Sequence, residues 1–144
     1  MFFGEYHYQL DEKSRLRIPS KLKASLSKEY IITKGINNSL FIFGKEFFES
    51  EFLTKLTSVP TFSVSGQKPI RALLSSSFEV AEDSQGRFLL PSTLKDFAKI
   101  SKNVVFIGVG NRIEVWSEEN WNEYNNEDGK TFDEMVESLS EFNI

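Results

Sequence analysis

Residues 11–23 of the chain are DEKSRLRIPSKLK, and residues 83–95 are DSQGRFLLPSTLK. The two stretches align without gaps at an offset of 72 residues, and six of their thirteen positions are identical. The shared residues are Asp, Arg, Pro, Ser, Leu and Lys, and chance seldom repeats such types in one order. Because a repeat decides how the rest of a chain is interpreted, the match predicts a molecule built from two copies of one small unit.

The similarity continues beyond this block after a shift of one residue. Residues 38–43 (NSLFIF) parallel residues 111–116 (NRIEVW), and both are typical of strands. Each is preceded by another short β-rich run, at 30–33 and at 104–107, with Gly and Asn in between. Gly and Asn favour tight turns between antiparallel strands, so we expect two hairpins in each half.

Within the matched block, each copy predicts a short strand that runs into a proline and then a short helix. The strands are expected at 15–18 and 87–90, where the following proline ends strand pairing and presets a helical φ. The helices are expected at 19–26 and 91–98. Each has apolar residues four positions apart, so one stripe of each helix should face inward.

Longer helices are expected after the last strand of each copy. Residues 45–57 place Phe48, Phe52 and Leu56 four residues apart, and a counterpart helix after Trp116 carries Trp121 and Tyr124. We assign these aromatic side chains to the core. A final amphipathic helix is expected at 131–142. Its apolar residues are Phe132, Met135, Val136 and Leu139.

The sequence therefore predicts an α+β chain with a mainly β core. We expect a first repeat at 1–57, a linker at 58–74, and a second repeat with C-terminal helices at 75–144. The linker is expected because residues 58–69 mix Pro, Ser and Gly, and a short helix is expected at 69–74.

The composition indicates a globular protein without thiol chemistry. Hydrophobic residues make up 40% of the chain and aromatic residues 14%, which can supply a core. No cysteine is present, which excludes disulfides, thiolate zinc sites and cysteine nucleophiles. The single histidine, His7, is expected to point outward from a strand. We expect no metal, no other cofactor and no small-molecule substrate. No apolar run approaches the length of a membrane span, so we expect a cytoplasmic protein.

Charge is divided unevenly along the chain. The net charge is −4, but residues 113–144 carry −9 and residues 1–112 carry +5. A basic body with an acidic end is what we expect of a nucleic-acid binder whose acidic helices face away from the ligand. Acidic surface helices are common, so this division alone is weak evidence.

The pattern Asp-x-x-Gly-Arg-x-x-x-Pro is complete in the second copy, at Asp83, Gly86, Arg87 and Pro91. Asp begins such turns because its carboxylate accepts hydrogen bonds from nearby backbone N–H groups, and Gly takes a positive φ without steric cost. The guanidinium that follows can brace the turn by pairing with the Asp, or it can point toward guanine or phosphate. From these residues alone, the two interpretations are equally supported.

The two motif copies, the opening residues 3–6 (FGEY) and the run 109–116 (VGNRIEVW) together resemble the MraZ family over nearly the whole chain. The Asp-x-x-Gly-Arg motif by itself would indicate only the broader AbrB-like group. The resemblance implies two swapped-hairpin, AbrB-like β-barrel halves in one chain and a ring-forming homo-oligomer. It further implies a nucleoid-associated regulator, usually a repressor, that binds direct repeats in double-stranded DNA upstream of the division and cell-wall gene cluster.

The resemblance assigns DNA contact to the cations around the two turns. The candidates for DNA contact are Lys13, Arg15 and Arg87, with Arg17 added from its charge and position. The turn-forming candidates are Asp11, Ser14, Asp83 and Gly86. We expect Lys21, Lys23 and Lys28 to lie on a solvated helix face.

Two positions distinguish the copies. Ser14 stands where the family pattern has Gly, and a left-handed φ there would cost about 1 kcal/mol. Gln85 stands in the second copy where Lys13 stands in the first. We therefore expect the first half to contribute more positive charge.

Two other classes of function can be compared with DNA binding. An antitoxin-like module that binds a partner protein would need an exposed apolar patch, for which the helix at 131–142 is the candidate. A hydrolase is poorly supported, because the chain has no Gly-x-Ser-x-Gly elbow, phosphate loop or metal cluster. The carboxylates Glu118, Glu119, Asp133 and Glu134 are expected to be solvated. We thus predict a protein that is not an enzyme and has no catalytic residue.

Overall fold

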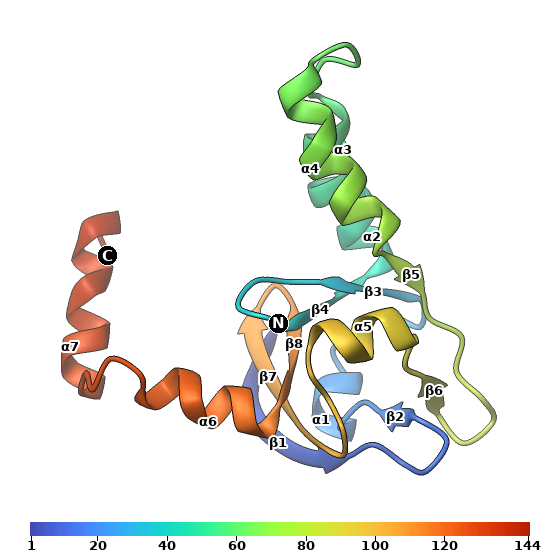
Figure 1. The fold of residues 1–144 in the computed structure, drawn as a ribbon, viewed down its shortest axis with the longest axis vertical. Coiled ribbons are helices and arrows are strands. Elements are labelled where there is room, and N and C mark those ends of the chain that lie inside the picture. The colour runs from blue at the N-terminus through green and yellow to red at the C-terminus, as the bar shows by residue number, and fades with distance from the viewer.

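The computed structural model describes residues 1–144 and has the predicted α+β architecture (Figure 1). The strands are β1 (Phe2–Gln9), β2 (Arg15–Arg17), β3 (Tyr30–Lys34), β4 (Leu40–Gly44), β5 (Phe78–Glu79), β6 (Arg87–Leu89), β7 (Asn103–Gly110) and β8 (Ile113–Ser117). They form a six-stranded antiparallel sheet in the order β1-β7-β8-β4-β3-β5 and a two-stranded ribbon of β2 and β6. Each predicted strand is present, but the expectation of two hairpins in each half was wrong. Only β3–β4 and β7–β8 form hairpins, because the remaining strands pair with the opposite repeat.

The repeats exchange strands, as the resemblance implied. β1 of the first repeat pairs along its whole length with β7 of the second, from Phe2 opposite Gly110 to Gln9 opposite Asn103. In return, β5 of the second repeat pairs with β3 of the first. The ribbon joins one strand from each repeat, with Leu16 opposite Phe88 at its centre. Each half is therefore completed by the other.

A single core lies between the large sheet and the ribbon. It contains 19 buried residues, including equivalent positions of the two repeats such as Leu16 and Phe88, and Leu22 and Leu94. All four of these side chains are at most 2% exposed. Burying a side chain of this size contributes roughly 1.5–3 kcal/mol, so the shared core couples the folding of the two halves.

The helices of the matched block are short and begin at prolines. The helix α1 (Ser20–Lys23) follows Pro19, whose φ is −50°, and α5 (Ser92–Phe97) follows Pro91, whose φ is −55°. Their inward side chains are buried, as the four-residue spacing predicted. These residues are Leu22, Leu26, Leu94 and Ala98.

A helical arm projects from the body between the two repeats (Figure 1). One side of it is continuous helix over α2 (Lys45–Phe47), a π-helical segment (Phe48–Leu53) and α3 (Thr54–Thr57), as the sequence predicted for 45–57. Phe48 is buried with Ile31 and Phe43 in a small second cluster at the base of the arm.

The returning helix of the arm, α4 (Val64–Ser75), begins five residues before the short helix expected at 69–74. The side chain of Ser63 caps it by accepting a hydrogen bond from the N–H of Gly66 at 3.1 Å. Gly66 lies so close to Val59 that a Cβ atom would approach it to 2.4 Å. The Pro, Ser and Gly residues that predicted a linker therefore lie partly in a loop and partly in a capped, closely packed helix.

The C-terminal helices extend away from the body on the side opposite the two turns in Figure 1. They are α6 (Glu118–Asn126), α7 (Phe132–Glu137) and a 3-10 segment (Ser138–Phe142). The assignment of the α6 aromatics to the core was wrong for Tyr124, which is 41% exposed, although it and Trp121 pack on Trp116. None of the helices is both long enough and apolar enough to span a bilayer.

Candidate nucleic-acid interface

The first turn is held by a single carboxylate. Asp11 Oδ1 accepts hydrogen bonds from the backbone N–H groups of Lys13 at 2.9 Å and Arg15 at 2.8 Å. Its other oxygen, Oδ2, accepts from Nε of Arg15 at 2.8 Å. Ser14 takes a left-handed conformation with φ 59°, as the Gly of the motif predicted. Arg15 therefore braces its own turn through one edge of its guanidinium.

The second turn repeats this geometry. Asp83 Oδ1 accepts from the backbone N–H groups of Gln85 at 2.8 Å and Arg87 at 3.0 Å, and Oδ2 accepts from Nε of Arg87 at 3.0 Å. Gly86 has φ 77°. The bracing interpretation of Arg15 and Arg87 is therefore correct for Nε in both copies. Their side chains remain 27% and 28% exposed, which leaves the outer nitrogens able to meet a ligand.

The hydrogen bonds to the two carboxylates lower their pKa values. The backbone N–H of Arg15 is the largest influence that holds the pKa of Asp11 below its usual 3.8, and that of Arg87 does the same for Asp83. Because the pKa values are lowered by folding, both carboxylates stabilise the fold at neutral pH. That contribution is lost as the pH falls through the lowered values, so the turns are fully braced under ordinary conditions.

The β2–β6 ribbon brings the two turns to one face of the molecule (Figure 1). Arg15 Nη1 lies 3.8 Å from Asp83 Oδ2, so the first turn reaches the carboxylate of the second. Leu16 and Phe88 face the core, and alternation along a strand places the residues on either side of them on the outer face. We call this outer face the ribbon face; it consists of Arg15, Arg17, Arg87 and Leu89.

Arg17 is the guanidinium on the ribbon face that no carboxylate neutralises. It is exposed, forms no ion pair, and lies directly opposite Arg87 in the ladder. Like charges directly opposite each other in a sheet are destabilising, and a bound anion would relieve that repulsion. Lys13 is also exposed and unpaired at the tip of the first turn. The structure thus leaves Arg17, which the sequence supported least, exposed and free of any carboxylate partner.

Two lysines near the turns make contacts that the sequence did not indicate. Nζ of Lys95 donates to Oγ of Ser14 at 3.1 Å, and Lys23 pairs with Glu82, which also accepts a hydrogen bond from Tyr30. Burial would raise the pKa of Glu82, but the bonds from Lys23 and Tyr30 outweigh it and keep the pKa below its usual value. Lys23 is therefore not simply part of a solvated helix face, as expected, but holds the second turn.

Arg112, the arginine of the run 109–116, is bound to other side chains of the fold. Arg112 donates through Nη2 and Nε to Glu114 at 2.8 and 3.1 Å, and Trp116 Nε1 donates to the same carboxylate at 3.0 Å. The guanidinium lies 4.5 Å from the ring centre of Phe41 on β4. This run of sequence therefore joins the repeats and does not contribute to the ribbon face.

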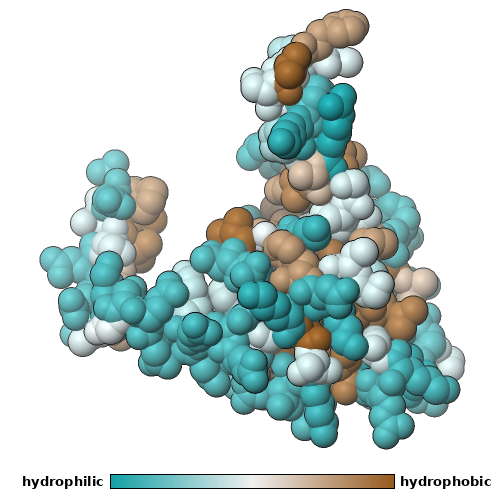
Figure 2. Space-filling view, viewed as in Figure 1, coloured by the Kyte–Doolittle hydropathy of each residue, from teal (hydrophilic) through white to brown (hydrophobic).

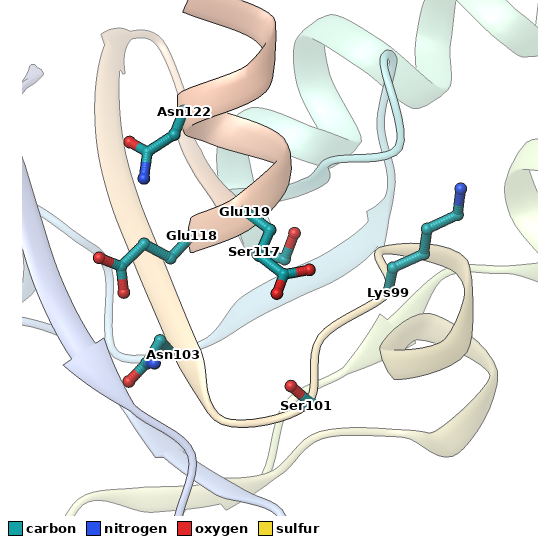
Figure 3. A pocket seen from close by; sticks show the side chains of 7 residues that line it. All are labelled: Lys99, Ser101, Asn103, Ser117, Glu118, Glu119 and Asn122. Carbon is teal, nitrogen blue, oxygen red and sulfur yellow. The ribbon is translucent and has the colours of Figure 1, made fainter.

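A hollow beside the start of α6 is lined by polar side chains (Figure 3). It has a volume of about 290 Å³ and is lined by Lys99, Ser101, Asn103, Ser117, Glu118, Glu119 and Asn122. Ser117 caps α6 by accepting from the N–H of Asn120 at 3.1 Å, and acidic side chains in the first turn of a helix favour its dipole. Ser117, Glu118 and Glu119 are therefore accounted for by the helix start. No group of three or more His, Cys, Asp or Glu side chains is placed to hold a metal ion.

The apolar side of α7 has no cover. Figure 2 shows hydrophobic side chains along the side of this helix that faces the body across open space. The exposed residues are Phe132 (74%), Met135 (43%) and Val136 (47%) on α7 and Leu139 (42%) on the 3-10 segment that follows it. They are the residues that the sequence proposed as a protein-binding patch.

Comparison with known proteins gives one consistent result. The family model described as "MraZ protein, putative antitoxin-like" matches residues 1–64 and 73–142. Proteins named transcriptional regulator MraZ from Thermoanaerobacter pseudethanolicus and Oenococcus oeni are each 38% identical over 144 residues and cover both chains completely. The relative of the same name from Moorella thermoacetica is 37% identical over the same length. The two matched segments correspond to the two repeats.

Proposed function

Because the chain belongs to the MraZ family, we propose that it is a transcription regulator that binds double-stranded DNA through the ribbon face. The observation that carries the proposal is the gathering of three guanidinium groups from both repeats on one face of a two-stranded ribbon. The major groove of B-DNA is wide enough to admit such a ribbon. The names of the relatives support regulation and leave the target open.

The cations of this face would take different roles. Arg17, which is free of carboxylates, suits bidentate contact with O6 and N7 of guanine. Lys13 at the tip of the turn suits a phosphate. Arg15 and Arg87 are fixed through Nε and would present only their outer nitrogens, which favours positioning on the backbone. Since the first repeat supplies Lys13, Arg15 and Arg17, it would carry most of the electrostatic contact.

We further propose that the protein acts as a homo-oligomer, in a ring, on direct repeats in the promoter of the division and cell-wall gene cluster. One ribbon face makes few contacts, but linked copies convert later contacts into intramolecular ones and raise avidity by about 10²–10⁴. Occupation of the promoter would repress transcription and place the protein at the nucleoid, within the cytoplasm. The support for this assembly is the resemblance to the family.

The proposal is tested by a gel shift with the DNA just upstream of the chain's own gene. We expect Arg17→Ala to weaken binding by about tenfold or more, because a bidentate Arg–guanine contact is worth about 1–3 kcal/mol. The matched control is Arg71→Ala, which removes the same charge from an exposed position on α4 and should leave binding unchanged. Equal effects of the two substitutions would move the site away from the ribbon face.

A second candidate function rests on the uncovered side of α7. Its apolar residues could bind a partner protein in the manner of an antitoxin, a word that the description of the family model also contains. A pull-down that returns one heterologous protein in a stoichiometric amount, together with no DNA shift, would favour this function over DNA binding.

A further inference from the structure

Leu89 is an aliphatic side chain beside the arginines of the ribbon face. It is 65% exposed and lies directly opposite Arg15 in the β2–β6 ladder. Under the offset of 72 residues it occupies the position that Arg17 holds in the first repeat. The ribbon face therefore breaks the symmetry of the repeats at one place, where a guanidinium is replaced by an isobutyl group.

The fold does not require an apolar side chain at this position. The neighbours Phe88 and Leu90 are each 2% exposed and point into the core, and alternation along the strand directs Leu89 away from it. A single exposed leucine is ordinary on a protein surface. Leu89 is distinguished by its neighbours, because the other three residues of the ribbon face are all arginines.

Apolar and guanidinium groups recognise different features of the major groove. Arginine pairs with O6 and N7 of guanine, whereas an apolar side chain contacts the C5-methyl group that only thymine presents. The same ribbon thus carries the chemistry for both bases, with Arg17 at one end and Leu89 at the other.

We propose that Leu89 is a specificity-determining residue that contacts the C5-methyl group of a thymine. This inference rests on the proposed function, and it adds which base Leu89 contacts and how far that base lies from the one contacted by Arg17. Strands rise about 3.3 Å per residue, so the cross-strand pair of Leu89 and Arg15 lies about 7 Å from the pair of Arg87 and Arg17. That distance corresponds to about two base pairs along the DNA axis.

The inference also predicts that the two ends of the bound DNA site differ in sequence. A ribbon with arginine at both equivalent positions would suit a palindromic site, because its two strands would recognise the same base. With Arg17 in one strand and Leu89 in the other, the ends of the ribbon prefer guanine and thymine respectively. We therefore expect a site without two-fold symmetry.

The experiment removes the methyl group from the DNA and the side chain from the protein. Duplexes from the region upstream of the chain's own gene carry deoxyuridine in place of one thymine at a time, which keeps base pairing and deletes only the methyl. For the natural protein, we expect one such replacement to weaken binding by about fourfold, the value of one buried methyl-sized group. Leu89→Ala should weaken binding to thymine DNA by a similar factor and should not distinguish deoxyuridine from thymine.

Two further variants complete the design. Leu89→Arg should change the preference at the same base pair from thymine toward guanine. Ile36→Ala removes an aliphatic side chain that is 64% exposed, in the turn between β3 and β4 and outside the ribbon face, and should behave as the natural chain. The inference is overturned if the natural protein binds but tolerates every deoxyuridine, or if Leu89→Ala remains sensitive at the same thymine. Failure of the natural protein to bind any duplex would instead overturn the proposed function, and this inference with it.

Discussion

The two turns have the same backbone but carry different side chains. In both, one carboxylate accepts two backbone hydrogen bonds and one from an arginine Nε, and the third residue after the Asp has a positive φ. That residue is Ser14 in the first turn and Gly86 in the second, and the preceding residue is Lys13 or Gln85. The two copies therefore share the hydrogen bonds that shape the turn, but they differ in the charge of the side chains that the turn presents.

The lysines that follow the turns show the same divergence. Lys23 and Lys95 are equivalent under the offset of 72 residues, and each reaches across to the other repeat. Lys95 donates to Oγ of Ser14 in the first turn, whereas Lys23 pairs with Glu82 beside the second. Each turn is therefore secured by the opposite repeat, but through a different acceptor.

The largest expected effect comes from making the first repeat resemble the second. The double variant Lys13→Gln with Arg17→Leu should bind the upstream DNA about a hundredfold more weakly, because it removes one phosphate contact and one base contact. The slope of log affinity against log salt should become less steep by about 0.9 from the loss of Lys13 alone. Fluorescence anisotropy titrations at several salt concentrations measure both quantities. Binding within threefold of the natural chain would show that the difference between the turns has no role in DNA binding.

An intermediate effect is expected when the second turn is given the side chain of the first. In Gly86→Ser, the new Cβ meets no other atom within 4 Å, so the change tests the backbone conformation alone. A left-handed φ costs about 1 kcal/mol for a residue with a Cβ atom, which lowers the melting temperature by about 3 °C in a chain of this length. Lys23 is held by Glu82 and is not expected to compensate. Calorimetry checks this result, with Gln85→Ser as the control, and an unchanged melting temperature would contradict it.

The sequence could predict the equivalences between the turns but not the contacts between them. The positive φ of Ser14 follows from the motif, because the aligned residue is Gly. Whether Arg15 braced its turn or faced DNA could not be decided, since both use the same side chain. The contacts of Arg15 with Asp83 and of Lys95 with Ser14 join different copies. A repeat identifies equivalent residues, but equivalent residues offer identical local partners, so it cannot tell which copy supplies each one.

The helical regions were predictable to different degrees for a similar reason. The spacing of apolar residues predicted the continuous helix at 45–57, because its pattern depends on neighbours within one segment. It did not predict that α4 starts at Val64, where capping by Ser63 and packing of Gly66 against Val59 outweigh low helix propensity. Leu89 was not singled out from the sequence, because its significance depends on the arginines that the ribbon places beside it.

The smallest effect is expected for Ser14→Gly, because this substitution makes two opposing contributions to the free energy of unfolding. Glycine relieves a left-handed strain of about 1 kcal/mol but removes the acceptor of Lys95, and an intramolecular hydrogen bond is worth about 1 kcal/mol. The net change in the free energy of unfolding should therefore lie within about 0.5 kcal/mol of zero. In a Lys95→Met background the hydrogen bond is already absent, so the same substitution should stabilise the chain by about 1 kcal/mol. Chemical denaturation of the four proteins in this cycle measures the difference, and equal effects of Ser14→Gly in both backgrounds would show that the bond from Lys95 does not offset the strain.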